Sequence, residues 1–176
     1  PPALRMALSV KVGSFAQPAS TGNQSITGLG FQPKLVLFFM NHQTGDGGAA
    51  NLVVSYGAAT SPSNRFYFSG SGQSGAATHN CSRSLSVTAC IGAVVVASAT
   101  LAAEADLESM DSDGFTLNWT TADATARIVN YIALGGSDIS GARCGEIVGT
   151  AITGNQSFSG LGFRPTALIT FCMGTI

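Results

Sequence analysis

The chain has 176 residues, of which 45% are hydrophobic and only 10% are charged, and its formal net charge is −1. Soluble domains are about a quarter charged on average, so most of this surface must be neutral. Only two lysines, Lys11 and Lys34, are present, which argues against a phosphate-collecting patch and hence against nucleic-acid binding. The longest apolar run, residues 90–97, is strand length and well short of the roughly 18 residues of a membrane span, so no membrane partner is expected.

A segment of the sequence repeats at an offset of 153 − 21 = 132 residues. Thr-Gly-Asn-Gln-Ser at residues 21–25 returns unchanged at 153–157, and Gly-Leu-Gly-Phe-Gln-Pro at 28–33 returns as Gly-Leu-Gly-Phe-Arg-Pro at 160–165. Isolated residues match at the same offset: Gly13 with Gly145, Phe39 with Phe171 and Met40 with Cys172. The repeat predicts that a whole structural segment is copied.

The offset divides the chain into three parts. Residues 1–8 are an N-terminal arm, residues 9–143 form a first β-sandwich repeat of ordinary domain size, and residues 144–176 begin a second. About thirty residues cannot bury a core of their own. We therefore expect the incomplete second repeat to be completed by further chain or to dock on another unit.

The pattern along the chain is that of short strands separated by turns. Turn-rich clusters occupy residues 20–25 and 28–33, and a Gly/Ser-rich stretch at 69–77 is predicted to be a surface loop. Strands are predicted at residues 35–40, 51–57, 64–69, 85–88, 90–97, 115–119 and 126–134.

One segment leaves its conformation open. Residues 101–110 have a helix-forming composition, yet their apolar residues largely alternate as in a strand. A hairpin turn is predicted directly after it, at residues 111–114. Without a convincing long helix, the pattern predicts an all-β fold: an antiparallel β-sandwich, jelly-roll-like, with a partial second copy of the same domain.

Four motifs together resemble a known group of sequences. Thr-Gly-Asn-Gln-Ser, Gly-Leu-Gly-Phe-Gln-Pro, Asp-Gly-Phe-Thr-Leu-Asn-Trp at 113–119 and Tyr-Ile-Ala-Leu-Gly-Gly at 131–136 are similar to an uncharacterised β-protein family of tailed phages and environmental viral genomes, often present as two tandem copies. The resemblance covers most of residues 9–176. It implies a virion or host-surface setting and assigns no residue a role.

Acidic residues concentrate in one region, where an oxygen-rich cluster could hold Ca²⁺. Their spacing supplies only a fragment of the EF-hand pattern, so a solvated strand edge and hairpin turn is the favoured interpretation. The five residues are Glu104, Asp106, Glu108, Asp111 and Asp113.

Enzymatic interpretations find little support. A Ser-His-Asp arrangement would need His42 or His79, the only histidines, and no Gly-x-Ser-x-Gly elbow is present. The paired glycines Gly28/Gly30 and Gly160/Gly162 precede no helix, so turns with positive φ explain them better than a phosphate cradle. We assign no catalytic, cofactor-binding or metal-binding residue, and no cofactor.

Cysteines and aromatic residues leave alternatives open. Cys81 and Cys90 could close a hairpin as a disulfide, but two free, half-buried thiols are favoured. Trp119 and three tyrosines, Tyr56, Tyr67 and Tyr131, could form a sugar-stacking platform, although aromatics on alternating strands more often lie in the core. Phe31 and Phe163 are predicted to be equivalent core anchors.

Two functions follow from these observations. The leading hypothesis is a non-enzymatic structural virion protein of a tailed phage, a capsid decoration or fibre component that acts through surface complementarity and self-association. Its partners would be further copies of itself, as a homo-oligomer, or other virion proteins. The alternative is a carbohydrate- or host-surface-binding β-module whose loops at 41–48 and 69–79 recognise a host glycan.

Overall fold

The computed structural model describes residues 7–78, 80–149, 151 and 153–171. Within these residues the protein has ten strands and no helix, which confirms the all-β sandwich. Accordingly, this part of the chain contains no helix of the length and apolarity needed to span a membrane. The strands are β1 (Leu8–Ala16), β2 (Gly22–Thr27), β3 (Pro33–Met40), β4 (Leu52–Ser61), β5 (Asn64–Gly72), β6 (Cys81–Ser86), β7 (Ile91–Val94), β8 (Leu101–Asp111), β9 (Gly114–Thr121) and β10 (Ile128–Gly136).

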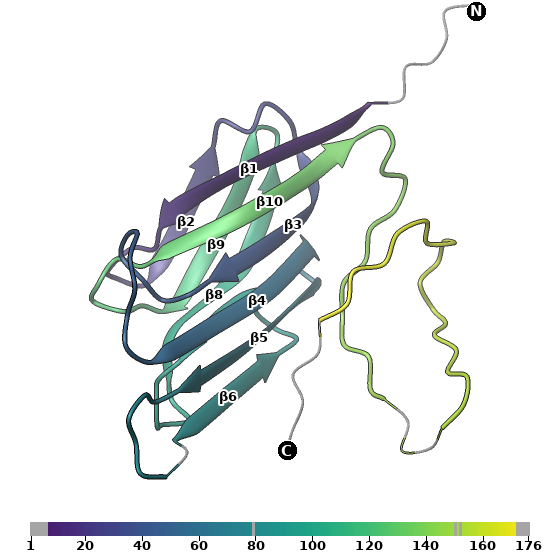
Figure 1. Ribbon diagram of the computed structural model, residues 1–176. Helices are drawn as coiled ribbons and strands as arrows, with labels where there is room; N and C mark the ends of the chain where they lie inside the picture. The colour runs from purple at the N-terminus through teal and green to yellow at the C-terminus, as the bar shows by residue number, and fades with distance from the viewer. Residues whose placement is uncertain (1–6, 79, 150, 152, 172–176) are drawn as a thin grey trace, which may run out of the picture.

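The strands form two antiparallel sheets that pack face to face (Figure 1). The larger has the order β1-β10-β3-β4-β5-β6 and the smaller β2-β9-β8-β7. Consecutive strands β3 to β6 make a meander in the first sheet, and β7 to β9 make one in the second. Strands from the two ends of the chain pair with each other in both sheets: β1 pairs with β10 in the larger sheet, and β2 pairs with β9 in the smaller one. The connectivity is thus a meander in each sheet, joined by the nested pairs β1–β10 and β2–β9, and it differs from the two Greek keys of a jelly roll.

The core lies between the sheets and is built by alternating residues of both. Phe38 of β3 and Phe115 of β9 pack edge to face with ring centroids 5.6 Å apart, and Tyr131 of β10 meets Phe115 at 5.4 Å. Trp119 is also almost fully buried. Such aromatic contacts add about 0.5–1.5 kcal/mol each beyond the area that they bury.

Two glycines let β7 approach the larger sheet closely. A Cβ at Gly57 of β4 would overlap the carbonyl oxygen of Cys90, and one at Gly92 would overlap the ring of Tyr67. The Tyr67 hydroxyl then donates to Glu104 of β8 at 3.0 Å. Burial, with Glu104 nearby, raises the pKa of Tyr67 to about 12, so the phenol is neutral at any ordinary pH.

Several boundaries differ from the sequence prediction. Residues 101–111 are entirely strand, which settles the open choice for that segment. The predicted turn at 20–25 is wrong in its second half, because β2 starts at Gly22 and pairs with β9. The predicted loop at 69–77 begins too early: β5 continues to Gly72, and its Ser69 and Ser71 face the interior.

The second repeat has no strands in its described residues. The described residues of 137–171 run beside the larger sheet as a long irregular loop (Figure 1). Phe163 is 37% exposed and touches Gly141, so the prediction that it is a core anchor is wrong. Its counterpart Phe31 is partly buried against the core, as predicted.

Candidate functional site

The outer face of the six-stranded sheet carries a row of three aromatic side chains. Phe39, Tyr56 and Phe68 occupy directly paired positions on β3, β4 and β5. Their ring centroids lie 5.9 Å and 5.3 Å apart. The inward residues of the same strands already fill the core, so this aromatic row faces away from it.

Apolar side chains also lie beside the aromatic row. Leu85 on β6, paired with Phe68, continues the row and is 52% exposed. A neighbouring row holds Val12 of the edge strand β1, which is 68% exposed, and its register partners Ile132 and Leu37. A sheet face this apolar is unusual for a side turned to water and is typical of an interaction surface.

The second repeat already contacts this face. Phe171, which matches Phe39 at the repeat offset, stacks on Tyr56 with centroids 5.1 Å apart and meets Phe68 at 6.1 Å. At the other end of the loop, the backbone N–H of Cys144 donates to the side-chain oxygen of Asn64, whose amide donates to the Cys144 carbonyl oxygen at 2.6 Å. The loop is therefore fastened at two points on β4 and β5.

A shallow opening of about 210 Å³ lies beside the aromatic row. Phe39 and Tyr56 line it with the amide side chains of Asn130 and Asn41. Aromatic faces next to amide groups suit a ligand with both an apolar face and hydroxyl groups, such as a sugar ring.

The sequence motifs contact one another along the pairing of β2 with β9. Trp119 donates through Nε1 to the side-chain oxygen of Gln24 at 2.9 Å, and the Gln24 amide donates to the carbonyl oxygen of Ala16 at 2.8 Å. The N–H groups of Gly28 and Gly30 both donate to the carboxylate of Asp113. The motifs of β2 and of the turn after it are therefore held by the motif at β9.

The fourth motif joins the same cluster through a close contact. The ring of Phe31 lies against Gly135, where a Cβ would overlap it. Both Gly28 and Gly30 have positive φ, at 84° and 81°, which confirms the turn interpretation of this glycine pair. Their N–H groups are already occupied by a carboxylate of the chain itself.

The acidic residues on β8 and the following turn serve separate structural contacts. Asp106 forms an ion pair with Arg65 of β5 at 2.6 Å, linking the two sheets. Glu104 accepts from Tyr67, and Asp111 accepts from Ser109 and Thr116. No group of three or more potential ligand side chains converges within the described ranges. The five acidic residues are close in sequence but do not converge on one point in space.

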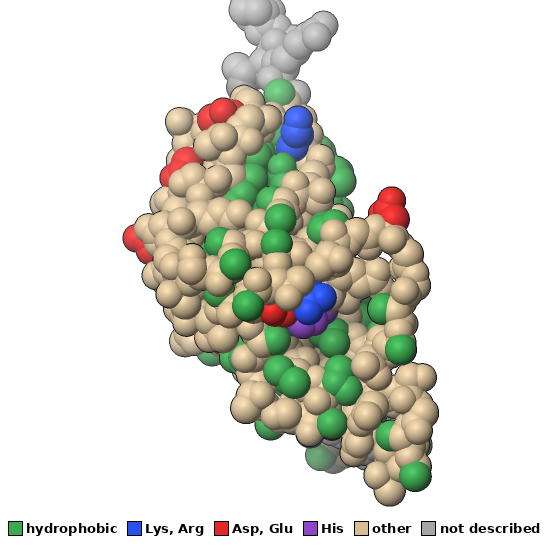
Figure 2. All heavy atoms as spheres, turned by 90° about the vertical axis from the view of Figure 1, so that its left-hand side faces the viewer, with side chains coloured by type: hydrophobic (Ala, Val, Ile, Leu, Met, Phe, Trp, Pro, Cys, Tyr) green, Lys and Arg blue, Asp and Glu red, His purple; other side chains and the backbone are tan. Residues whose placement is uncertain are grey.

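His42 lies at the end of β3 in a small charged cluster. Its Nε2 is 3.1 Å from Oδ2 of Asp123, which also pairs with Arg127 at 3.1 Å, yet the imidazole nitrogen is buried without a well-formed hydrogen bond. Burial first, and then the Arg127 guanidinium, lower the pKa of His42 in spite of Asp123. Figure 2 shows a histidine beside a basic and an acidic side chain on an otherwise largely uncharged surface.

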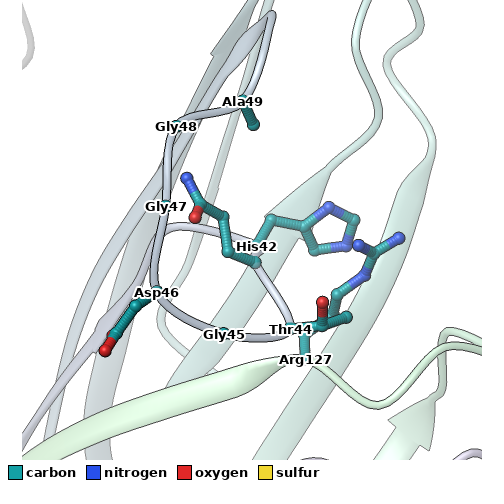
Figure 3. A pocket seen from close by; sticks show the side chains of 9 residues that line it. His42, Thr44, Gly45, Asp46, Gly47, Gly48, Ala49 and Arg127 are labelled. Carbon is teal, nitrogen blue, oxygen red and sulfur yellow. The ribbon is translucent and has the colours of Figure 1, made fainter.

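A second shallow opening, of about 270 Å³, lies beside this cluster. It is lined by residues 42–49 and Arg127. His42 and Arg127 point toward one another, whereas Asp46 points away from both (Figure 3). His42 lies beside the carboxylate of Asp123, and a histidine paired with an aspartate makes up two members of a catalytic triad. Among the described residues no serine, threonine or cysteine side chain is found hydrogen-bonded to His42 as the nucleophile would be. His79, the other candidate, lies outside the described residues.

The remaining candidates divide between core and surface. Trp119, Tyr67 and Tyr131 are buried, which confirms the favoured prediction that they lie in the core and excludes the sugar-stacking alternative for these three; Tyr56 belongs to the aromatic row. Cys81 and Cys90 are free thiols, which rules out the disulfide, and burial raises the pKa of Cys90 well above its usual value. Cys172 lies outside the described residues.

Neither Phe39 nor Phe68 was singled out from the sequence. The continuous apolar run at 35–40 gives no indication of which of its residues face outward. The sequence matches no family model and no curated protein, and the fold matches no solved structure.

Proposed function

We propose that the protein is a non-enzymatic structural component of a tailed-phage virion that works by self-association through the outer face of its six-stranded sheet. The observation that carries the proposal is the aromatic row Phe39-Tyr56-Phe68, which is continued by the exposed Leu85 on β6 and lies beside a row that ends in the exposed Val12 on β1. The virion setting rests on the family resemblance of the four motifs.

The low charge of the chain supports association between copies. Net charge of −1 over 176 residues gives little long-range repulsion between copies. The stacking of Phe171 on Tyr56 supports the proposal, since the face already packs against one aromatic ring. That ring belongs to the repeat counterpart of Phe39.

A charge placed on the face tests the self-association. Val12→Lys puts an ammonium group on an exposed position of β1, and we expect it to shift the protein toward monomer in multi-angle light scattering over a concentration series. Asn23→Lys is the matched control, since Asn23 is exposed on β2, the edge strand of the other sheet. Equal behaviour of both variants and the unmodified protein would contradict association through this face.

The virion setting needs a separate measurement. Mass spectrometry of purified particles from a host-phage system that encodes the chain should find it at high copy number, in a fixed ratio to the major capsid or tail protein. Absence from the particles would contradict the virion role and leave the association chemistry intact.

Carbohydrate binding is the second candidate, favoured by the opening beside the aromatic row. A sugar ring stacked on Tyr56 could hydrogen-bond with the amides of Asn41 and Asn130. We expect Tyr56→Ala to abolish binding on a glycan array, and Tyr131→Phe, which alters a buried ring, to retain it. No glycan bound by the unmodified protein would remove this candidate.

A further inference from the structure

The described part of the second repeat keeps the backbone conformation of the first. Gly154, Gly160 and Gly162 have φ of 142°, 83° and 78°, against 126°, 84° and 81° at the matching Gly22, Gly28 and Gly30. The Gln156 amide donates to the carbonyl oxygen of Val148 at 2.7 Å, which repeats the bond from Gln24 to Ala16. The second repeat thus repeats the turn glycines and the glutamine bond of the first, although no strand is assigned in its described residues.

Residues of this segment that match core positions are exposed. Leu168 is 74% exposed, whereas its counterpart Val36 is fully buried, and Phe158 is 50% exposed against 9% for Ile26. Phe163 and Ile147, the counterparts of Phe31 and Phe15, are exposed as well. The second repeat therefore presents an uncovered apolar inner face.

The first repeat shows what covers such a face. Strand β10 lies between β1 and β3, and β9 pairs with β2. Phe115 of β9 and Tyr131 of β10 both meet the ring of Phe15, each with centroids 6.2 Å apart. Gly135 of β10 receives the ring of Phe31.

The second repeat also retains the residues that, in the first repeat, make polar contacts with the covering strands. Gln156 matches the glutamine that accepts from Trp119, and Gly160 and Gly162 match the two glycines whose N–H groups donate to Asp113. In the first repeat these contacts go to Trp119 and Asp113 of the motif at 113–119, so the matching face of the second repeat favours a segment with this motif over any other apolar strand.

We infer that the described residues of 140–171 form a strand-accepting site that binds the β9–β10 unit of a second copy of this sequence by antiparallel pairing, an exchange in which that unit leaves β1, β2 and β3 of its own sandwich. The register follows from the first repeat, where Ala133 pairs with Val36 and Ile132 with Leu37. In the second repeat, the incoming Ala133 would pair with Leu168 and the incoming Ile132 with Ile169. This inference rests on the proposed self-association and names its partner segment.

The test uses the full chain and a fluorescent peptide of its residues 111–136. We expect saturable binding by fluorescence anisotropy. Leu168→Asp in the full chain should weaken it at least about tenfold, because the charge would enter a core position. Ile169→Asp is the control: this neighbour is also exposed, at 59%, but matches the outward position of Leu37. It should change the affinity less than about threefold.

A peptide variant checks the polar contacts. Asp113→Ala in the peptide should weaken binding by about tenfold, since it removes the acceptor of two backbone N–H groups. Melting temperatures of both chain variants should equal that of the unmodified protein, because neither residue contacts the sandwich core.

Three outcomes would overturn the inference. These are no saturable binding, equal weakening by Leu168→Asp and Ile169→Asp, and binding insensitive to Leu168→Asp, which would place the peptide in the first repeat. The substituted residues, Leu168 and Ile169, belong neither to the aromatic row nor to the position of Val12 on β1. A chain that binds the peptide but fails to respond to Val12→Lys would contradict the proposed function alone.

Discussion

One four-residue turn has two outcomes in this chain. Gly-Leu-Gly-Phe ends in the half-buried Phe31 in the first repeat and in the exposed Phe163 in the second. Local sequence therefore sets the turn, while burial of the ring depends on whether Gly135 and its strand are present.

Alanine substitution of the two phenylalanines should separate these effects. Phe31→Ala should lower the free energy of unfolding by about 2 kcal/mol, less than the 3–5 kcal/mol of a fully buried ring. Phe163→Ala, its repeat counterpart, should change it by less than about 0.5 kcal/mol. Urea denaturation measures both. Equal losses would mean that the second repeat contributes to the folded core.

His42 should make the stability of the protein depend on pH. Its pKa is lowered in the folded state from 6.5, so the unfolded chain binds a proton first as the pH falls. This stabilising contribution is present above about pH 6.5 and is lost below it. The pKa of Asp123 is also lowered, from 3.8, so its contribution is lost only at much lower pH.

A variant isolates the histidine from other pH effects. His42 has a φ of 60°, a conformation that asparagine tolerates well, so His42→Asn should fold. We expect the melting temperature to fall less between pH 7.5 and 5.5 in the variant than in the unmodified protein. The same decrease in both would contradict a role for His42.

At the scale of strands, most elements were predictable from alternation and turn residues. The strand at residues 114–121 follows from its alternating pattern and the Asp-Gly turn before it. The strand start at Gly22 could not be read from a cluster of Thr, Gly, Asn and Ser. This strand is held by the side chain of Gln24, which forms one hydrogen bond with Ala16, 8 residues away, and another with Trp119, 95 residues away.

The candidate site was less predictable for a similar reason. The aromatic row depends on which face of β3, β4 and β5 points outward, and an apolar run such as residues 35–40 carries no alternation to show it. Tyr56 was among the aromatic candidates, but its partners Phe39 and Phe68 are neighbours only through strand register.

The ion pair between Arg65 and Asp106 should stabilise the packing of the two sheets. Asp106→Asn removes the charge that pairs with a mostly buried guanidinium, and we expect a loss of about 1–2 kcal/mol in chemical denaturation, reduced from that of a fully buried pair by partial exposure. Glu108→Gln, an exposed change on the same strand, is the control and should cost less than about 0.5 kcal/mol. A similar cost for both would mean that the pair contributes nothing specific.

At the scale of the whole molecule, all ten strands of the described residues fall between Leu8 and Gly136. Docking of the second repeat on the first was expected only in general terms. Its location depends on the stacking of Phe171 on Tyr56, a contact between residues 115 positions apart (171 − 56) that no local pattern encodes.

Removal of residues 144–176 should leave a folded sandwich that self-associates more strongly. The core is built by residues 26–133, so unfolding should stay cooperative. Loss of the two aromatic contacts of Phe171 should lower the free energy of unfolding by about 1–2 kcal/mol. The uncovered aromatic row should then increase self-association, seen as a higher mass in light scattering.

In the full chain, Phe171→Ala should reproduce both effects in part, whereas Phe158→Ala, an exposed ring of the same segment, should reproduce neither. Unchanged mass and stability after the removal would mean that the second repeat does not protect this face.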